Sequence, residues 1–238
     1  MSSAQPELKE SLRRRESAVG DGNGSARGVA ALLHSFAEGR SKPKAKEQEV
    51  LDVATEYFLA HGYQGASINA MARSSGISKE SIYRYFSSKK QLFEAVIGRE
   101  LAEYQTRLRR LSAEKTLDLR EALINIAETV LGLVTMDRTL ALRRLIFDEA
   151  RRSPDVGQHY YKIGPEYAFA AVEEIFRSHH AESDFDPAIL SHHFLGLVCF
   201  LPILERECAL GAVPSRAEIR ARAESIVGDF IKAFLKAK

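Results

Sequence analysis

The chain has 238 residues, of which 45% are hydrophobic and 28% charged, and its formal net charge is +2. This length allows one or two domains with a sizeable core. No apolar run approaches the roughly 18 residues of a membrane span. The charged N-terminus lacks the apolar stretch of a signal peptide, so we expect a cytoplasmic protein with no membrane partner. The small net charge is weak evidence for nucleic-acid binding, so that function has to be argued from motifs.

Residues 1–43 are rich in small and polar side chains, and the stretch 20–28 (GDGNGSARG) has the composition of a linker. We therefore expect a mostly disordered extension, with a weak apolar stripe at 29–36 that could dock as a helix. The alternative is an arm that follows DNA, with Lys42, Lys44 and Lys46 nearest the backbone.

The first firm helix is predicted over 47–61. Val50, Leu51, Ala54 and Phe58 recur there at helical spacing and would form its buried face. Gly62 is predicted to end this helix, because glycine adopts a positive φ without a steric penalty.

A second, short helix is predicted to start after Ser67, whose hydroxyl can accept a hydrogen bond from the first turn. Ile68, Met71 and Ala72 lie on one face of this helix. Gly76 then permits a tight turn. The pattern indicates two short helices packed around a glycine turn.

The helix after that turn is predicted over 79–86, with Ser78 as its cap and with Ile82 and Phe86 facing inward. Two short helices around a glycine turn are typical of the helix-turn-helix unit, whose second helix enters the major groove of DNA. Glycine turns also join helices in ordinary bundles, but this second helix has an unusually polar outer surface. Its outward side chains are Lys79, Ser81, Tyr83, Arg84 and Tyr85.

Further helices are predicted over 89–111, 118–134, 165–180, 187–210 and 215–234, and one that starts near 135–137 and runs through 151. Capping boxes are predicted at 88–91, 118–121 and 215–218. The stretch 156–161 is predicted as a short turn or helix, and Pro202 is expected to break or kink the helix that contains it. No segment alternates with period two, so the chain is predicted to be all-α with nine or ten helices.

Cys199 and Cys208 are predicted to be reduced core residues, because they lie in an apolar helical stretch. The histidine pairs at 179–180 and 192–193 are interpreted as solvated helix ends or dimer-surface residues. Neighbouring histidines on a helix point about 100° apart, so they rarely share a metal ion. No catalytic arrangement or glycine-rich phosphate loop is recognisable. We therefore expect no enzyme activity, no metal and no cofactor.

Residues 46–96 resemble the N-terminal domain of TetR-type (tetracycline-repressor-like) transcriptional regulators. Met71 stands where the family usually has isoleucine or valine, which is a volume-conserving change. Asn69 and Ala70 replace charged residues that are common there, so phosphate contacts from this helix would be fewer. The matching residues are Phe58, Gly62, Tyr63, Ser67, Ile68, Ala72, Gly76, Ile77, Ser78, Ile82, Tyr83, Arg84, Tyr85, Phe86, Ser88 and Lys89.

The resemblance implies a homodimeric regulator, usually a repressor, that a small ligand releases from a palindromic operator. Residues 44–92 would form a three-helix DNA-binding domain, and residues 93–238 a helical bundle for ligand binding and dimerisation. The last two helices would pair with those of a second copy. Residues 143–176 resemble one C-terminal subgroup of the family more weakly. The DNA contacts would come from Lys46, Ser67, Ser78, Lys79, Ser81, Tyr83, Arg84, Tyr85 and Lys89, with phosphates held by Ser67, Lys89 and the two tyrosine hydroxyls.

The ligand would be small and apolar or amphipathic, because pockets between bundle helices are lined mainly by apolar side chains. The candidate lining residues are Phe147, Tyr160, Tyr167, Phe169 and Phe194, although many such aromatics are plain core. Candidates for a polar role are Gln158, His159 and Glu205. The alternatives are a helical sensor or scaffold without DNA binding and a small helical enzyme. Neither alternative predicts salt-dependent affinity for DNA.

Overall fold

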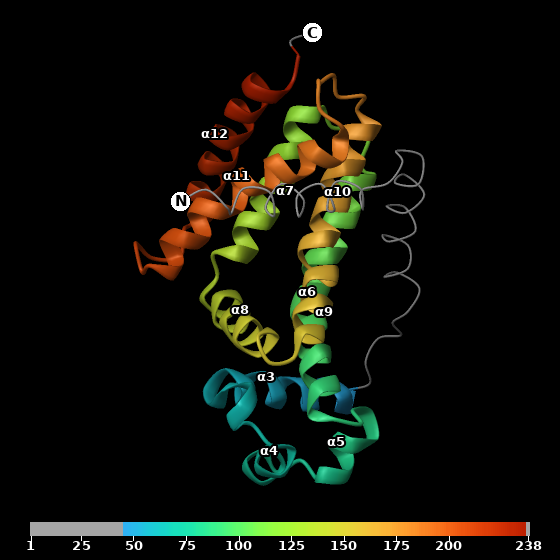
Figure 1. Ribbon diagram of the computed structural model, residues 1–238, viewed down its shortest axis with the longest axis vertical. Coiled ribbons are helices and arrows are strands. Elements are labelled where there is room, and N and C mark those ends of the chain that lie inside the picture. The colour runs from blue at the N-terminus through green and yellow to red at the C-terminus, as the bar shows by residue number, and fades with distance from the viewer. Residues whose placement is uncertain (1–44, 237–238) are drawn as a thin grey trace, which may run out of the picture. The chain divides into compact units, whose positions relative to one another are not determined.

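The computed structural model describes residues 45–236, and within that range every regular element is an α-helix (Figure 1). The predicted all-α class is confirmed, and the described range contains ten helices, labelled α3 to α12. The expectations for residues 1–43, and those for Lys42 and Lys44, lie outside the described residues.

The N-terminal helices are α3 (Ala45–Gly65), α4 (Ile68–Ser75) and α5 (Lys79–Tyr85). Gly62 interrupts the helical backbone of α3 with a φ of 71°. The predicted stop at this glycine is therefore present, although one further turn follows it. The predicted inward face of α3 is also confirmed, because Val50, Leu51, Ala54 and Phe58 are all buried.

Helix α6 (Lys89–Ala113) is the longest in the described range and joins the first three helices to the rest of the chain. It contacts α3 as well as α7, α9 and α10 (Figure 1). The domain boundary predicted between residues 92 and 93 falls inside this continuous helix. Ser88 caps α6 by accepting a hydrogen bond from the Gln91 N–H at 3.1 Å. The Gln91 side chain bonds to Ser87 and not to Ser88, so the predicted capping box is wrong in that half.

The remaining helices are α7 (Leu119–Val134), α8 (Asp137–Ala150), α9 (Pro154–Ile163), α10 (Pro165–Ser178), α11 (Pro187–Glu207) and α12 (Arg216–Phe234). Asp118 accepts a hydrogen bond from the Glu121 N–H at 2.8 Å, and Asp186 accepts one from the Ala188 N–H at 2.9 Å. Ser215 forms the complete capping box predicted for α12. The starts of α7, α11 and α12 thus have their predicted caps, but the capping box predicted at 118–121 is wrong in one half, because the Glu121 carboxylate accepts from Arg220 at 3.0 and 3.2 Å.

The structure decides between the alternatives left open for two later helices and corrects a third prediction. The stretch 156–161, predicted as a short turn or helix, lies in a ten-residue helix, α9, because proline suits a first helical position. Helix α8 begins at Asp137, one of its two predicted starts, although no side chain caps it and its N-cap residue is Met136. Helix α11 continues through Pro202 without a break. The Pro202 ring is buried, and its packing offsets the one backbone hydrogen bond that proline cannot make.

The C-terminal core lies around α7, which contacts α6, α10, α11 and α12. Phe176, Phe194 and Phe230 form an aromatic cluster there, with ring centroids 5.1–6.4 Å apart. The cluster joins α10, α11 and α12, and all three rings are almost completely buried. Phe194 therefore holds helices together within the core.

Both cysteines are free. Cys199 is half-buried on α11, as the apolar character of its neighbours suggested. Cys208 is exposed, so its assignment to the core is wrong. The reason is that α11 ends at Glu207, and Cys208 begins the turn that follows.

Candidate nucleic-acid interface and ligand cavity

Helices α4 and α5 form the two-helix unit that the sequence predicts, and local hydrogen bonds define each end of the turn. The Ser67 hydroxyl accepts from the Ala70 N–H at 3.1 Å, and the Ser78 hydroxyl accepts from the Ser81 N–H at 3.1 Å. Gly76 has a φ of 73°, a left-handed conformation that other residues adopt only with strain. These three positions set the angle at which α5 leaves α4.

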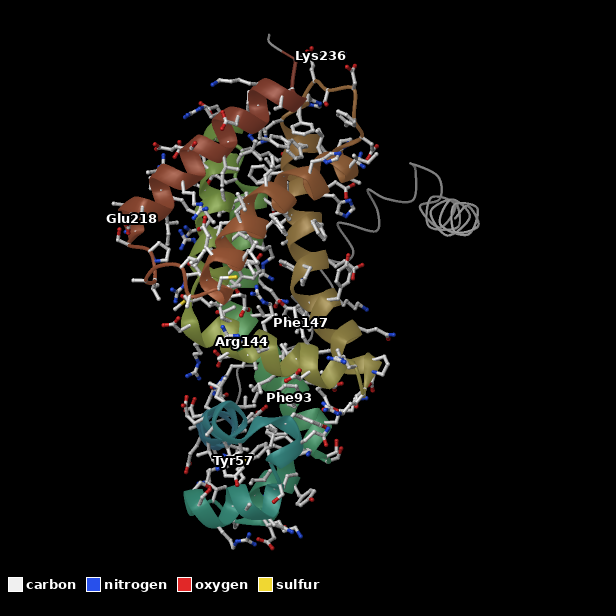
Figure 2. All side chains as sticks on the ribbon, turned by 60° about the vertical axis from the view of Figure 1, so that its left-hand side comes forward. Tyr57, Phe93, Arg144, Phe147, Glu218 and Lys236 are labelled. Carbon is white, nitrogen blue, oxygen red and sulfur yellow. The ribbon has the colours of Figure 1, made fainter. Side chains whose placement is uncertain are left out.

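Helix α5 rests on an aromatic core built from α3 and α6. The Phe93 ring, whose position Figure 2 marks, lies 4.9 Å from the rings of both Phe58 and Tyr63, measured between centroids. Ile82 is completely buried, and Phe86 is nearly so. The inner face of α5 is therefore fixed, and its other residues are free to face outward.

The outer face of α5 carries cations and hydroxyls. Tyr83 is 45% exposed, and the Lys79 ammonium lies 5.6 Å from its ring centroid. Arg84 is exposed and forms no ion pair with any residue of the described range. Tyr85 is half-buried, whereas Ser81 is tied to Ser78 by a hydroxyl–hydroxyl bond of 2.9 Å. This face offers a guanidinium, an ammonium and phenol hydroxyls, the groups that donate to phosphates and base edges.

Two lysines among the predicted DNA contacts also have protein partners in this structure. Lys46 pairs with Glu49 at 2.8 Å. The Lys89 ammonium donates to the carbonyl oxygens of Tyr63 and Ala66 at 2.9 and 3.0 Å and lies 4.4 Å from the Tyr63 ring centroid. Lys89 thus holds the connection between α3 and α4 in place, and only its third N–H remains for a phosphate.

Helix α8 is bonded to the DNA-binding helices through side chains that the sequence alone did not indicate. Arg138 donates to Glu56 of α3 at 2.7 Å and to Glu100 of α6 at 2.9 Å. Gln64 donates to the buried Glu149 of α8 at 2.6 Å. These partners are 38 to 85 positions apart in the chain, so no local pattern could have revealed them.

A cavity of about 1100 Å³ lies among helices α6 to α11, and its wall is mostly apolar. Phe147, Tyr160 and Phe169, three of the five aromatic residues predicted to line a pocket, are part of this wall. Figure 2 shows Phe147 and Arg144 on α8, at the wall of this cavity. Tyr167 and Phe194 do not line it, because both are buried in the packing between helices. The role of the three lining residues in ligand binding stays a prediction.

The cavity also has a polar group that the sequence analysis missed. Arg143 lines the wall, although its side chain is only 8% exposed. Arginine is seldom buried, and the sequence analysis did not name Arg143 as a lining candidate. One signal was available: Arg143 lies three residues after Leu140 and three before Ile146, so it falls on the buried face of α8.

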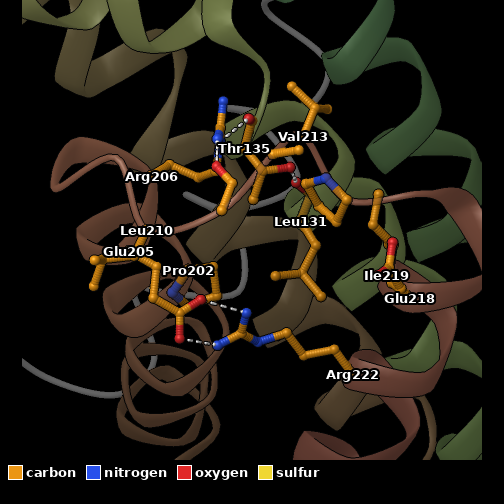
Figure 3. A pocket seen from close by; sticks show the side chains of 13 residues that line it. Leu131, Thr135, Pro202, Glu205, Arg206, Leu210, Val213, Glu218, Ile219 and Arg222 are labelled. Atoms are coloured by element: carbon orange, nitrogen blue, oxygen red, sulfur yellow. Dashed lines mark hydrogen bonds and ion pairs between the residues drawn. The ribbon is translucent and has the colours of Figure 1, made fainter.

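Glu205, one of the polar residues predicted for the pocket, lies elsewhere. It lines a smaller cavity of about 340 Å³ bordered by α7, α11 and α12 (Figure 3). There both oxygens of Glu205 accept hydrogen bonds from Arg222, at 2.6 and 2.8 Å. The hydrogen bond from Arg222 lowers the pKa of Glu205 and outweighs the opposing effect of burial. Gln158 and His159 line neither cavity.

The histidine pairs do not form a metal site within the described part of the chain, where no group of three potential ligands is close enough. The two ring nitrogens of His179 lie 2.9 Å from the Ile175 carbonyl oxygen and 3.0 Å from the Leu117 carbonyl oxygen. His192 packs against Phe169 with ring centroids 4.4 Å apart, at the edge of the large cavity.

Comparisons with known proteins agree with this arrangement. Residues 50–96 match the family described as bacterial regulatory proteins, tetR family. Residues 121–236 match the C-terminal domain of AefR-like transcriptional repressors. The two matches cover the helix-turn-helix unit and the bundle that contains the large cavity.

Individual relatives have related names. The regulator AcrR of Shigella flexneri is 32% identical over 117 residues, which are 45% of this chain and about half (52%) of that protein. The repressor Rv1474c of Mycobacterium tuberculosis is 28% identical over 72% of this chain and 87% of its own length. The solved structure of the flavonoid-responsive regulator FrrA is 28% identical, covers 81% of this chain and 98% of its own, and has a TM-score of 0.66.

Both parts of the described fold therefore have counterparts in the same group of proteins. An N-terminal helix-turn-helix unit precedes an all-helical C-terminal bundle in this chain, and each part matches its own TetR-type domain. The chain belongs to the TetR family of DNA-binding transcriptional regulators.

Proposed function

We propose that this chain represses transcription as a homodimer that binds a palindromic operator and leaves it when a small ligand occupies the large cavity. The observation that carries the DNA-binding part is the outer face of α5. Arg84 and Lys79 have no ion-pair partner among the described residues, and Tyr83 is exposed beside them. A cationic, hydroxyl-rich face held on a rigid helix suits the major groove.

The individual contacts divide by chemistry. We assign phosphate contacts to the hydroxyls of Ser67, Tyr83 and Tyr85 and to the third N–H of Lys89, because hydroxyl and ammonium groups donate to phosphate oxygens. Arg84 and Lys79 project from α5 itself and are our candidates for base edges. Ser78, Ser81 and Lys46 already have protein partners, so their contribution to affinity is expected to be smaller.

The exposed apolar surface of α11 supports dimerisation. The expectation that no apolar run approaches membrane length is wrong for this helix, which by length and composition could cross a membrane, with a mean hydropathy of 1.7. Core helices of soluble proteins have the same properties. Only 33% of its apolar stretch is buried. Surfaces of this kind mark protein interfaces. The exposed side chains are Ile189, Leu197, Phe200, Leu201 and Leu204.

We propose that a second copy covers these side chains. Helix α12 offers small exposed residues at four-residue spacing, Ala217, Ala221 and Ser225, which would allow a partner helix to approach closely. In such a dimer the two α5 helices would reach successive major grooves of one operator. A soluble dimer of this kind would act in the cytoplasm.

Ligand control is supported by the position of α8. This helix lines the large cavity with Arg143 and Phe147, and it is bonded to α3 through Arg138 and Glu149. A ligand that binds one arrangement of α8 more tightly would change the spacing of the two recognition helices. FrrA is described as flavonoid-responsive, and the aromatic wall here would also suit a flat aromatic body. The proposal includes no catalytic step.

The test is selection of bound sequences from random duplex DNA by the purified full-length chain, at two salt concentrations. We expect an inverted repeat, with affinity that falls as salt rises because phosphate contacts release counterions. Arg84→Gln should weaken operator binding, whereas Arg151→Gln, on an exposed residue that follows α8, should not. A folded, ligand-stripped dimer that enriches no sequence would favour a sensor without DNA binding.

A further inference from the structure

We propose that the large cavity accepts an amphipathic ligand with a carboxylate head group, and that Arg143 binds this carboxylate. This inference rests on the proposed function of the cavity as a ligand site and adds the chemical class of the ligand. The argument starts from the hydrogen-bonding state of Arg143 and the groups around it.

Arg143 is a buried cation with unused donors. Its Nη2 atom donates to Glu207 at 2.7 Å. Neither its Nε nor its Nη1 has a hydrogen bond to any residue in the described range. A guanidinium has five N–H donors, and buried polar groups are nearly always hydrogen-bonded. Because Arg143 lines the cavity, these remaining donors are available to a ligand.

Two tyrosines, Tyr104 and Tyr160, also line the cavity. Burial raises the pKa of both, so these hydroxyls keep their protons and can donate. The positive charge of Arg143 acts on Tyr160 and partly offsets the rise of its pKa. Within residues 45–236 neither hydroxyl has a hydrogen-bond partner. The polar part of the wall therefore offers donors to an acceptor-rich group.

The acidic residues of the wall do not cancel this preference. Glu207 is already shared, because it accepts from Arg143 and also from Arg144, each at 2.7 Å. Asp148 is exposed to solvent at the edge of the cavity. Burial raises the pKa of Cys199 to about 11, so this thiol adds no negative charge near neutral pH. A carboxylate would thus meet the Arg143 cation in a wall that also carries phenol hydroxyls able to donate.

The rest of the cavity selects the body of the ligand. Its wall is mainly aromatic and aliphatic, with Phe147, Phe169 and Leu195 among the lining side chains. A volume of about 1100 Å³ leaves room for a body much larger than the head group alone. The ligand class that satisfies both parts of the wall is an apolar molecule with one carboxylate. The guanidinium of Arg143 would offset the free-energy cost of removing that carboxylate from water.

Binding of such an acid has a consequence for α8. The ligand carboxylate would lie near Glu207 and repel it, which weakens the ion pairs that link α8 to α11. Helix α8 is bonded to α3 through Gln64 and Glu149. The head group therefore gives the ligand a different affinity for two positions of α8, which a regulatory ligand requires.

The experiment compares two probes that share one body, 1-pyrenebutyrate and the neutral 1-pyrenebutanol. Binding to the full-length protein is followed by pyrene fluorescence anisotropy without DNA, and the chain has no tryptophan that would interfere. Because a hydrogen bond to a charged group is stronger than a neutral one, the acid should bind about tenfold more tightly than the alcohol. Equal affinities, or tighter binding of the alcohol, would overturn the proposal.

Three variants locate the preference. Arg143→Gln should bring the two affinities within about twofold of each other by weakening only the acid, because the charged donor is lost. Arg151→Gln, which removes a cation outside the cavity on the residue after α8, should leave both affinities unchanged. Glu207→Gln should strengthen binding of the acid several-fold, about three- to tenfold, because it removes a neighbouring negative charge.

The outcomes separate this inference from the proposed function. If Arg143→Gln weakened the binding of both probes equally, Arg143 would be merely structural and would not bind the carboxylate. If Glu207→Gln bound the acid more weakly than the parent, the proposed repulsion between Glu207 and the ligand carboxylate would be contradicted. Retained binding of the alcohol shows that the variants are folded. Operator affinity is measured separately without either probe, so a chain that binds no DNA but still prefers the acid would overturn only the proposed function.

Discussion

Replacing Lys89 with methionine should destabilise the DNA-binding helices. The methionine keeps the apolar stem but removes the ammonium that bonds the carbonyl oxygens of Tyr63 and Ala66. Each bond to a charged donor contributes roughly 1.5–3 kcal/mol when well formed. The contact with the Tyr63 ring adds about 0.5–1 kcal/mol, as for other partly exposed cations over aromatic faces.

Two effects reduce this sum. Ordering a lysine side chain costs up to about 2 kcal/mol of conformational entropy, which the variant recovers in part. Lys89 is also only partly buried, so water can reach the released carbonyl groups. A net loss of about 2 kcal/mol remains, and for a chain of this size that corresponds to a Tm lower by about 4–8 °C.

The assay is thermal unfolding followed by circular dichroism at one fixed protein concentration, because a dimer's Tm depends on concentration. Lys90→Met is the matched control. Its ammonium pairs with Asp155 at the surface, and exposed pairs contribute only about 0–1 kcal/mol. An unchanged Tm for Lys89→Met, together with a salt slope of operator binding reduced by about 0.9, would refute the reasoning and make Lys89 chiefly a phosphate contact.

Three further outcomes are expected. Gly76→Ala should cost about 1–2 kcal/mol from backbone strain alone, since the φ is 73° and no atom lies within 4 Å of the new Cβ; an unchanged urea midpoint would contradict this. Ser78→Ala should lower the free energy of unfolding by about 1 kcal/mol, because the hydrogen bond that caps α5 is lost; urea unfolding measures this change as well. Burial opposes ionisation of Glu100, but hydrogen bonds from Arg138 and Arg99 outweigh it and hold its pKa below the usual range. The stabilisation from ionised Glu100 is thus fully present above its unfolded pKa of about 4.3 and is lost as pH falls through its folded pKa, which lies below that value. The free energy of unfolding of Glu100→Gln should therefore fall less than that of the parent between pH 7 and pH 3.

The helix-turn-helix unit shows how far the sequence alone can lead. Ser67, Gly76 and Ser78 each define their structure through residues no more than four positions away. The inward faces of α3 and α5 follow from helical periodicity, and Phe58, Ile82 and Phe86 are buried as expected. Signals that act over one helical turn are fully contained in the sequence, which is why these predictions agree with the structure.

The cavity shows where such reasoning stops. Five aromatic residues were predicted to line a pocket, and nothing local distinguished Phe169, which lines the cavity, from Phe194, which packs into the core. Arg143 was missed because its surroundings come from six helices that are distant in the chain. Which apolar face meets another helix, and which borders a cavity, depends on how all the helices pack.

The sequence by itself determined most of the helices, the caps at Ser67, Ser78 and Ser215, the glycine turn and the resemblance to the TetR family, because each depends on neighbouring residues or on a contiguous motif. Only the tertiary structure decided that Lys89 bonds the carbonyls before α4, that α8 connects the cavity to α3, and that Arg143 is a buried cation. Those facts depend on pairs 23 to 85 positions apart, whose meeting is set by packing of the whole bundle and by no local preference.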